Sequence, residues 1–208
     1  MTVERLTLAA AELADEVGMQ NVTVAALARQ FGVKDASLYF HLRNAQDLRI
    51  RIALLALAEL ADRVAAALAG RAGKDALVAF ANAYRDYARQ HPGRYAAMQI
   101  DLDPETAAAS AGVRHAEMTR AILRGYRLSE PDQTDAVRMM HSTFHGFVSL
   151  ERTGGFRHTP QRGRLLVAHP GRPRRRPPQL AVTLTAEPSV AGEAEIRADP
   201  AVTVPPRR

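Results

Sequence analysis

The sequence predicts an all-α fold, and two observations carry that prediction. Apolar residues recur at helical spacing from residue 4 to residue 153, and no strand-like alternation of apolar and polar residues interrupts them. Glycine and proline divide this pattern into segments, for example at Gly18, Gly32, Pro104 and Pro131. The 208 residues are enough for one or two domains with a sizeable core. A composition of 47% hydrophobic and 24% charged residues is typical of a globular protein.

Three short helices and one long helix are predicted in the first third of the chain. The first helix places Leu6 and Leu13 on one apolar stripe and ends at Gly18, because glycine suits the residue after a helix. Thr23 suits the N-cap of the second helix, and Asn44 suits the N-cap of the long one. We expect these helices over residues 4–17, 24–31, 35–41 and 45–69.

Four further helices are predicted before residue 153. The run His91-Pro92-Gly93 breaks the helical pattern, and Pro104 and Pro131 suit the first turn of the helices that they open. Gly154 and the glycine after it end the last helix. We expect these helices over residues 75–90, 94–101, 105–125 and 131–152.

The composition changes abruptly after Arg157. Nine of the 12 prolines lie in residues 157–208, and this segment has ten Arg against four acidic residues, whereas residues 1–156 have no net charge. We expect the segment to be disordered, because its apolar content is too low to offset the entropy of ordering it. With 26 Arg and two Lys, the gene is expected to be GC-rich, and a shifted reading frame of residues 162–183 can spell an amphipathic helix. A frameshift product and a native basic tail that adds non-specific DNA affinity both stay open.

Residues 23–48 predict a helix-turn-helix. Gly32 supplies the turn between two short helices, and the small Ala28 allows them to cross closely. Apolar side chains of this stretch are expected to pack on Leu6, Leu13 and Leu48. The second short helix then has a free outer face of small and polar residues, which fits a DNA major groove. That face consists of Lys34, Asp35, Ala36, Ser37, Tyr39, Phe40 and His41.

This stretch resembles the DNA-binding domain of TetR-family transcriptional regulators. The resemblance is carried by Thr23-Val24, Leu27-Ala28, Gly32-Val33, Ala36-Ser37-Leu38-Tyr39, His41 and Leu48. It implies that Thr23 and Tyr39 contact phosphates, and that Lys34, Ala36, Ser37 and His41 lie at or near the groove. Where the family usually has a lysine, this chain has Ala45, so Arg43 or Arg49 is the expected replacement. Asp35 is expected to cap the helix, to accept from a cytosine amino group or to repel phosphate.

The later part of the chain resembles the ligand-binding domain of one subgroup of the same family. The matching runs are Tyr87-Ala88, His91-Pro92-Gly93-Arg94-Tyr95 and the stretch from Phe144-His145-Gly146, a W/F-H-G motif, to Phe156. The resemblance implies a homodimer that pairs through its last two long helices. It also implies a small, largely apolar effector bound among the helices of residues 75–150. Expected pocket residues are Tyr84, Tyr87, Tyr95, Met98, Met118, Ile122, Met140, Phe144 and His145.

We therefore predict a DNA-binding domain over residues 1–46, a larger helical ligand-binding and dimerisation domain over 47–156, and a tail over 157–208. The expected function is that of a ligand-responsive regulator, most simply a repressor that binds a palindromic double-stranded DNA operator as a homodimer. The alternatives are a helical ligand-binding protein or enzyme whose helix-turn-helix is only scaffold, and a regulator that no longer dimerises.

Other functional classes find little support. There is no cysteine, so disulfides and thiolate metal sites are excluded. His141 and His145 have the i,i+4 spacing of metal ligands, but no third ligand is paired with them, so we expect no metal and no cofactor. No catalytic arrangement is recognisable, no apolar run is long enough to span a membrane, and we expect a cytoplasmic protein that is not an enzyme.

Overall fold

The computed structural model describes residues 2–126 and 128–157, and within these ranges all regular secondary structure is helical, so the predicted all-α fold is confirmed. The proposals about residues 158–208 lie outside the described residues. The α-helices are α1 (Val3–Val17), α2 (Val24–Phe31), α3 (Asp35–Leu38), α4 (Ala45–Leu68), α5 (Gly73–Gln90), α6 (Pro92–Ala97), α7 (Pro104–Ala109), α8 (Gly112–Leu123) and α9 (Asp132–Arg152), with single 3-10 turns η1 (Met19–Asn21) and η2 (Arg124–Tyr126).

Three predicted helices differ in the structure. The helix expected over residues 94–101 is α6, which begins at Pro92 and ends at Ala97. The helix expected over residues 35–41 ends at Leu38, and the chain continues through a turn in which the His41 amide donates to the Leu38 carbonyl at 2.9 Å. The helix expected over 105–125 is divided into α7 and α8. Ser110 is extended there, and its hydroxyl donates to the Ala107 carbonyl and accepts from the Gly112 amide. Such local side-chain bonds compete with the helical ones.

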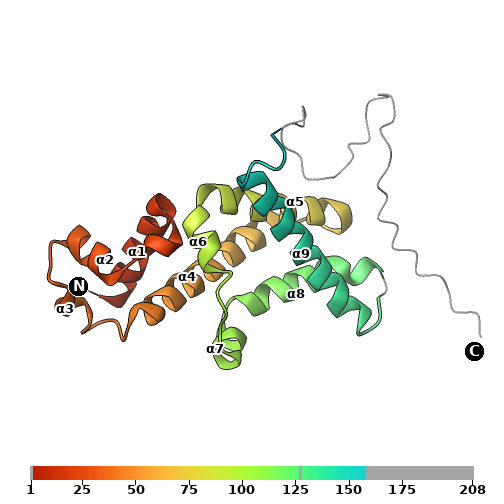
Figure 1. Ribbon diagram of the computed structural model, residues 1–208. Helices are drawn as coiled ribbons and strands as arrows, with labels where there is room; N and C mark the ends of the chain where they lie inside the picture. The colour runs from red at the N-terminus through yellow and green to blue at the C-terminus, as the bar shows by residue number, and fades with distance from the viewer. Residues whose placement is uncertain (1, 127, 158–208) are drawn as a thin grey trace, which may run out of the picture. The chain divides into compact units, whose positions relative to one another are not determined.

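A first hydrophobic core lies among α1, α2, α3, the first half of α4 and α6 (Figure 1). Leu6, Leu27 and Leu38 have no exposed surface, and Leu42 and Leu48 are 1% exposed. Phe31, Val33 and Leu13 pack against this cluster from its edge, as the sequence predicts. The core therefore holds α2 and α3 against α1 and α4 through their inward faces.

A second core lies where the rest of α4 meets α5, α8 and α9. It begins at Ala56, one turn after Ala53 of the first core, so α4 contributes to both. Its centre is aromatic: the Phe80 ring lies 5.5 Å from that of Phe144, and the Tyr84 and Tyr95 rings meet edge to face at 5.7 Å. Because α4 has 24 residues, it extends over about 36 Å and reaches from one core to the other.

The end of α1 is bound to the beginning of α6 at very short range. A Cβ added to Gly93 would lie 1.9 Å from the Ala14 carbonyl oxygen, so only glycine fits there. Oδ1 of Asp15 accepts from the backbone N–H groups of Gly93 and Arg94, each at 2.9 Å, and thereby caps α6. Oδ2 of the same carboxylate contacts Nδ1 of His91 at 3.0 Å.

One side-chain network continues from this junction, and a separate ion pair joins α5 to α9. Arg94 pairs with Glu59 of α4 at 3.1 Å, and Glu59 also accepts from the Tyr87 hydroxyl of α5 at 2.9 Å. Burial, followed by the charge of Glu59, raises the pKa of Tyr87 above its ordinary value. Farther along α5, the guanidinium of Arg85 binds both carboxylate oxygens of Glu151, which ties α9 to α5. That hydrogen-bonded pair holds the pKa of Glu151 below its ordinary value.

Gly93→Ala is expected to lower the free energy of unfolding by about 3 kcal/mol, because the new Cβ meets backbone atoms of α1 that cannot rotate away. Gly125→Ala is the matched control, since a Cβ there meets nothing within 4 Å. Urea unfolding of both variants measures the difference. Equal stability of Gly93→Ala and the unsubstituted protein would contradict the close approach of α6 to α1.

Candidate DNA interface and ligand cavity

The turn between α2 and α3 has the geometry of a helix-turn-helix. Oγ1 of Thr23 accepts from the Ala26 amide at 3.0 Å and caps α2, as predicted. Gly32 is left-handed, with φ 63° and ψ 30°, and the next amide, of Val33, donates to the Ala28 carbonyl at 3.0 Å. These bonds end α2 and direct the chain into α3.

Only one of the four residues of α3 is buried. Leu38 has no exposed surface, Ser37 is half-buried, and Asp35 and Ala36 are exposed. Of the other predicted DNA-binding residues, His41 is half-buried, and the exposed ones are Thr23, Lys34, Tyr39 and Arg43. All eight therefore keep accessible surface; seven follow one another around α3, whereas Thr23 stands apart at the start of α2.

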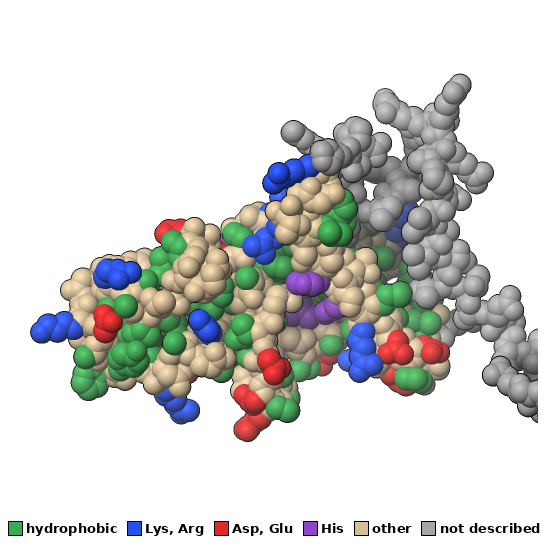
Figure 2. All heavy atoms as spheres, in the orientation of Figure 1, with side chains coloured by type: hydrophobic (Ala, Val, Ile, Leu, Met, Phe, Trp, Pro, Cys, Tyr) green, Lys and Arg blue, Asp and Glu red, His purple; other side chains and the backbone are tan. Residues whose placement is uncertain are grey.

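Phe40 lies in this region but is not among the residues predicted to contact DNA. Its side chain is 89% exposed, the highest fraction among the large hydrophobic side chains of the described residues, and neighbouring Tyr39 is 53% exposed. Hydrophobic side chains reach the surface at the end of the molecule that holds α1–α3 (Figure 2). The sequence carried a signal for Phe40, because it falls on the predicted outer face.

Charge over this part of the chain is balanced. Residues 1–52 have six basic and six acidic side chains. Asp47 of α4 pairs with Arg51 at 3.1 Å, and it also accepts from the Arg43 amide at 3.1 Å. Lys34, Arg43 and Arg49 take part in none of the ion pairs found among the described residues. Attraction for DNA must therefore come from where these cations lie, since the net charge supplies none.

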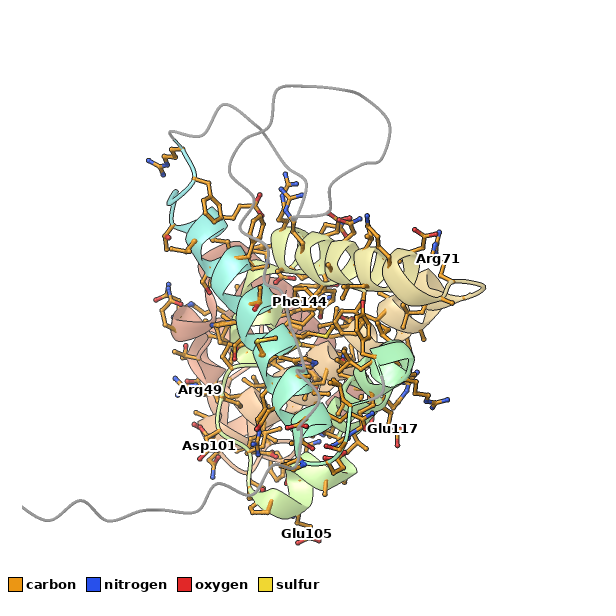
Figure 3. The ribbon with its side chains drawn as sticks, turned by 90° about the vertical axis from the view of Figure 1, so that its right-hand side faces the viewer. Arg49, Arg71, Asp101, Glu105, Glu117 and Phe144 are labelled. Atoms are coloured by element: carbon orange, nitrogen blue, oxygen red, sulfur yellow. The ribbon has the colours of Figure 1, made fainter. Side chains whose placement is uncertain are left out.

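A partly open cavity of about 380 Å³ lies at the edge of the second core, beside the end of α6. Figure 3 shows α9 crossing α5 and α8, with Phe144 labelled on the helix, and Figure 2 shows histidine side chains grouped on the face toward the viewer. The cavity is lined by Leu57, Leu60, Tyr84, Met98, Gln99, Gly112, His115, His141, Ser142 and His145.

Three of the nine predicted pocket residues line this cavity: Tyr84, Met98 and His145. Met118 and Ile122 line a second cavity of about 510 Å³ at the other end of α5 and α8. The remaining four line neither cavity. Tyr87 binds Glu59, Phe144 and Met140 pack in the cores, and the Tyr95 hydroxyl lies 2.8 Å from Nδ1 of His145.

Sequence reasoning missed most of the polar lining. Ser142 stands between two histidines on α9, and His141, Ser142 and His145 share one side of a helical turn. The sequence predicts His145 for the pocket, but it does not predict His141 or Ser142. His115 and Gln99 come from other helices, and no local pattern places them beside α9.

Two of the histidines have assigned roles in hydrogen bonding. Nε2 of His115 lies 3.1 Å from the Leu57 carbonyl oxygen. The Thr119 hydroxyl donates to the His115 carbonyl at 2.8 Å and lies 3.1 Å from Nε2 of His141. Burial lowers the pKa of both imidazoles below the ordinary value of 6.5, so both are uncharged near neutral pH.

Two further features, a metal-binding cluster and a membrane-spanning helix, were looked for among the described residues. Within residues 2–126 and 128–157, no group of three or more His, Asp or Glu side chains is arranged to hold a metal ion. In the same part of the chain, no helix combines the length and the apolar character that crossing a membrane requires.

Comparison with known proteins gives a consistent picture. Residues 6–52 match the family described as bacterial regulatory proteins, tetR family, and residues 77–169 match the Tetracyclin repressor-like C-terminal domain. An HTH-type transcriptional regulator of Mycobacterium tuberculosis is 39% identical over 144 residues, which span 67% of this chain and 65% of that protein.

Two more similar proteins extend this comparison. YobS of Bacillus subtilis, an HTH-type transcriptional regulator, is 31% identical over 72% of this chain and 78% of its own length. The crystal structure of the TetR-family regulator PfmR of Thermus thermophilus has 29% identity and a TM-score of 0.56, and the match covers 72% of this chain and 85% of PfmR.

Acidification below the ordinary histidine pKa of 6.5 is expected to destabilise the protein. Because the folded-state pKa of His115 and His141 is lowered, the unfolded chain binds protons in this range that the folded chain does not. Stability is then fully present above pH 6.5 and is lost as the pH falls toward the lowered values. Each imidazole contributes up to about 1.4 kcal/mol per pH unit. Urea unfolding at a series of pH values measures the slope.

His141→Gln tests the assignment, because glutamine does not titrate and its amide can still donate to Thr119. The variant should show a shallower loss of stability on acidification than the unsubstituted protein. An unchanged slope would mean that His141 is not the group that titrates.

Proposed function

This chain belongs to the TetR family of bacterial regulatory proteins, and we propose that it is a ligand-responsive transcriptional repressor. In this proposal a homodimer binds a palindromic DNA operator in the cytoplasm and releases it when a small molecule binds. The single observation that carries the proposal is α3, which buries Leu38 and leaves its other side chains accessible. A helix anchored by one side is free to enter a major groove.

The proposed contacts with DNA are of two kinds: contacts to phosphates, which position the protein, and contacts to base edges, which recognise the sequence. We assign phosphate contacts to Thr23 and Tyr39, supported by their exposure and by the Thr23 hydroxyl hydrogen, which capping leaves free to donate. Lys34 and Arg43 add positive charge beside them. We assign contacts to base edges to Ala36, Ser37 and His41. Only contacts to bases carry sequence information.

Phe40 and Asp35 complete this surface. A phenylalanine exposed at 89% is suited to an apolar contact with a thymine methyl group. Asp35 lies in the first turn of α3, where a negative charge suits the helix end. Toward DNA, its open roles are a hydrogen bond from a cytosine amino group and repulsion of phosphate. Either role would restrict the sequences that the protein tolerates.

The outer side of α9 supports pairing with a second copy. Met139 and Leu150 are 42% and 51% exposed, and Thr143 and Gly146 lie between them on the same stripe, at i, i+4, i+7 and i+11. Small residues in such a stripe allow two helices to approach closely. The second helix of the family's interface would fall after residue 157, outside the described residues, so a dimerisation-defective regulator remains the alternative.

Release of DNA is proposed to run through α6. Met98 and Gln99, at its end, line the cavity, while its beginning is capped by Asp15 of α1. A ligand that displaces Met98 or Gln99 would move α6 and, through the Gly93 contact, α1 and the helix-turn-helix. Couplings of this kind amount to about 1–3 kcal/mol.

Thr23→Asp is expected to weaken DNA binding without weakening the fold. Aspartate caps a helix as well as threonine does, but its charge repels the phosphate that we place there. Gel-shift titration on the DNA upstream of the protein's own gene, at two salt concentrations, should show at least about tenfold weaker binding to all sequences. Thr23→Ser, which keeps both the cap and a hydroxyl donor, should bind normally.

Ser37→Ala separates reading from positioning in the same assay. It should reduce the preference for the upstream DNA over random DNA while leaving random-sequence affinity unchanged. If Thr23→Asp binds like Thr23→Ser, the phosphate assignment is wrong. If the unsubstituted protein shifts no DNA at either salt concentration, the proposed repressor function is wrong. The alternative, a helical ligand-binding protein or enzyme whose helix-turn-helix is only scaffold, is then favoured.

Leu150→Glu is expected to shift the protein from dimer to monomer in analytical ultracentrifugation, because it places a charge on the proposed α9 interface in place of its most exposed apolar side chain. Asn82→Glu is the control, since it adds the same charge at an exposed position of α5. Equal sedimentation of the two variants as dimers would exclude this face of α9.

A further inference from the structure

We propose that the 510 Å³ cavity binds an organic carboxylate, with its apolar part inside the cavity and its carboxylate group on Arg71. This cavity lies at Leu68, the last residue of α4, whereas the helix-turn-helix adjoins the beginning of that helix. It shares no lining residue with the 380 Å³ cavity beside α6. The proposal therefore goes beyond the proposed function and rests on none of the contacts assigned to DNA or to the effector.

The inner wall of this cavity is apolar. Ala76 of α5 and Ile122 of α8 are buried there, at 4% and 7% exposure, and the half-buried Leu68 and Met118 pack against the same core. Small residues complete the wall: Ala72, Gly73, Ala121 and Gly125. The volume falls in the range of small-molecule sites, roughly 300–1,000 Å³, and methionine adapts its shape to what it contacts. The cavity therefore suits the apolar chain or ring of a small molecule.

The polar part of the lining is Arg71 and Tyr126, and both side chains are exposed. Figure 3 labels Arg71 at the turn between α4 and α5. Arg71 is the one charged residue among the ten that line the cavity, so the lining offers a counter-charge to an anion and none to a cation. Because both polar groups reach solvent, a charged head group bound there stays at the cavity mouth and keeps part of its hydration.

Arg71 has donors to spare for such a head group. Among the described residues its printed hydrogen bond runs from Nη1 to the Ala67 carbonyl, at the end of α4, and it takes part in none of the ion pairs found there. Nε and Nη2 lie on one edge of the planar guanidinium and can donate two parallel hydrogen bonds. A carboxylate, with two acceptor oxygens, matches this edge.

The chain segments that form the cavity are also basic as a whole. Residues 68–76 and 118–126 contain four basic side chains and one acidic side chain, a net charge of +3, whereas residues 1–156 have no net charge. These side chains are Arg71, Lys74, Arg120 and Arg124 against Asp75. A positive field around an apolar cavity attracts an amphiphilic anion and repels the corresponding cation.

Three probes with one apolar chain test this selectivity on the full chain near neutral pH: octanoate, octanamide and octylammonium. Calorimetry measures each dissociation constant. We expect octanoate to bind about tenfold more tightly than octanamide, its uncharged isostere, because charge-assisted hydrogen bonds are the stronger ones, and we expect octylammonium to bind most weakly. Equal binding of octanoate and octanamide, tightest binding of octylammonium, or binding of none of the three overturns the proposal.

Substitution of Arg71 identifies the group that recognises the carboxylate. Arg71→Gln should remove the preference for octanoate over octanamide, and Arg71→Lys, which keeps the charge but not the planar edge, should retain part of it. Arg89→Gln is the matched control, because it removes the same charge from an exposed position at the other end of α5. An unchanged preference in Arg71→Gln, or an equal loss in Arg89→Gln, overturns the role of Arg71.

Filling the cavity identifies the place where the apolar part binds. Ala121→Trp puts a large side chain on a lining position of α8 and should weaken the binding of all three probes. Ala65→Trp is the control, since Ala65 is exposed on α4 and lines neither cavity. Equal octanoate binding by the two variants would mean that the chain binds elsewhere. Thermal unfolding verifies that each variant folds, and the Arg71 variants decide the matter where Ala121→Trp does not.

Discussion

The contact between Asp15 and the beginning of α6 is the interaction on which the rest of the molecule depends. One carboxylate caps α6 through two backbone amides, at a place where the helices approach so closely that only glycine fits. A salt bridge between flexible side chains would allow sliding, but backbone contact at this distance does not. The bundle of α1–α3 is therefore attached to α6 as a unit, and a displacement of α6 has to move α1.

The second connection, through α4, has a different character. α4 contributes Ile52 and Ala53 to the first core and Leu60 and Val64 to the second. Glu59, which it also carries, receives Arg94 from α6 and Tyr87 from α5 at one carboxylate. The two routes between the cores thus meet at Arg94, whose neighbours on either side of the chain are Gly93 and the cavity-supporting Tyr95. In the proposed release of DNA, a change at the cavity wall would reach α1 and α4 through one short helix.

Local chemistry made the helix-turn-helix predictable, whereas the cavity was not. Thr23 and Gly32 act through bonds to residues within four positions, so their roles can be derived from spacing alone. His115 lines the cavity only because Leu57, 58 residues earlier, and His141 are brought beside it by packing. The run His91-Pro92-Gly93 ends α5, but Pro92 and Gly93 already belong to α6, and the need for glycine arises from Ala14, 79 positions earlier in the sequence. Ser110 divides the helix predicted over residues 105–125, because its hydroxyl makes two hydrogen bonds that compete with those of a helix. The spacing of apolar residues does not reveal such a competition.

The short α3 also changes how DNA recognition has to be understood. A helix of four residues, one of them buried, offers at most three side chains to a groove, and Asp35 is among them. If the protein is to recognise more than two bases, its contacts must extend beyond α3 into the turn of residues 39–41. Tyr39 and Phe40 in this turn are the most accessible aromatic residues of the α1–α3 bundle. Balanced charge in residues 1–52 removes the general attraction that would otherwise hold a poorly matched site. In the proposed DNA complex, affinity would then depend on the placement of single side chains around α3, and binding would be sensitive to small rotations of α3 and hence to the position of α6.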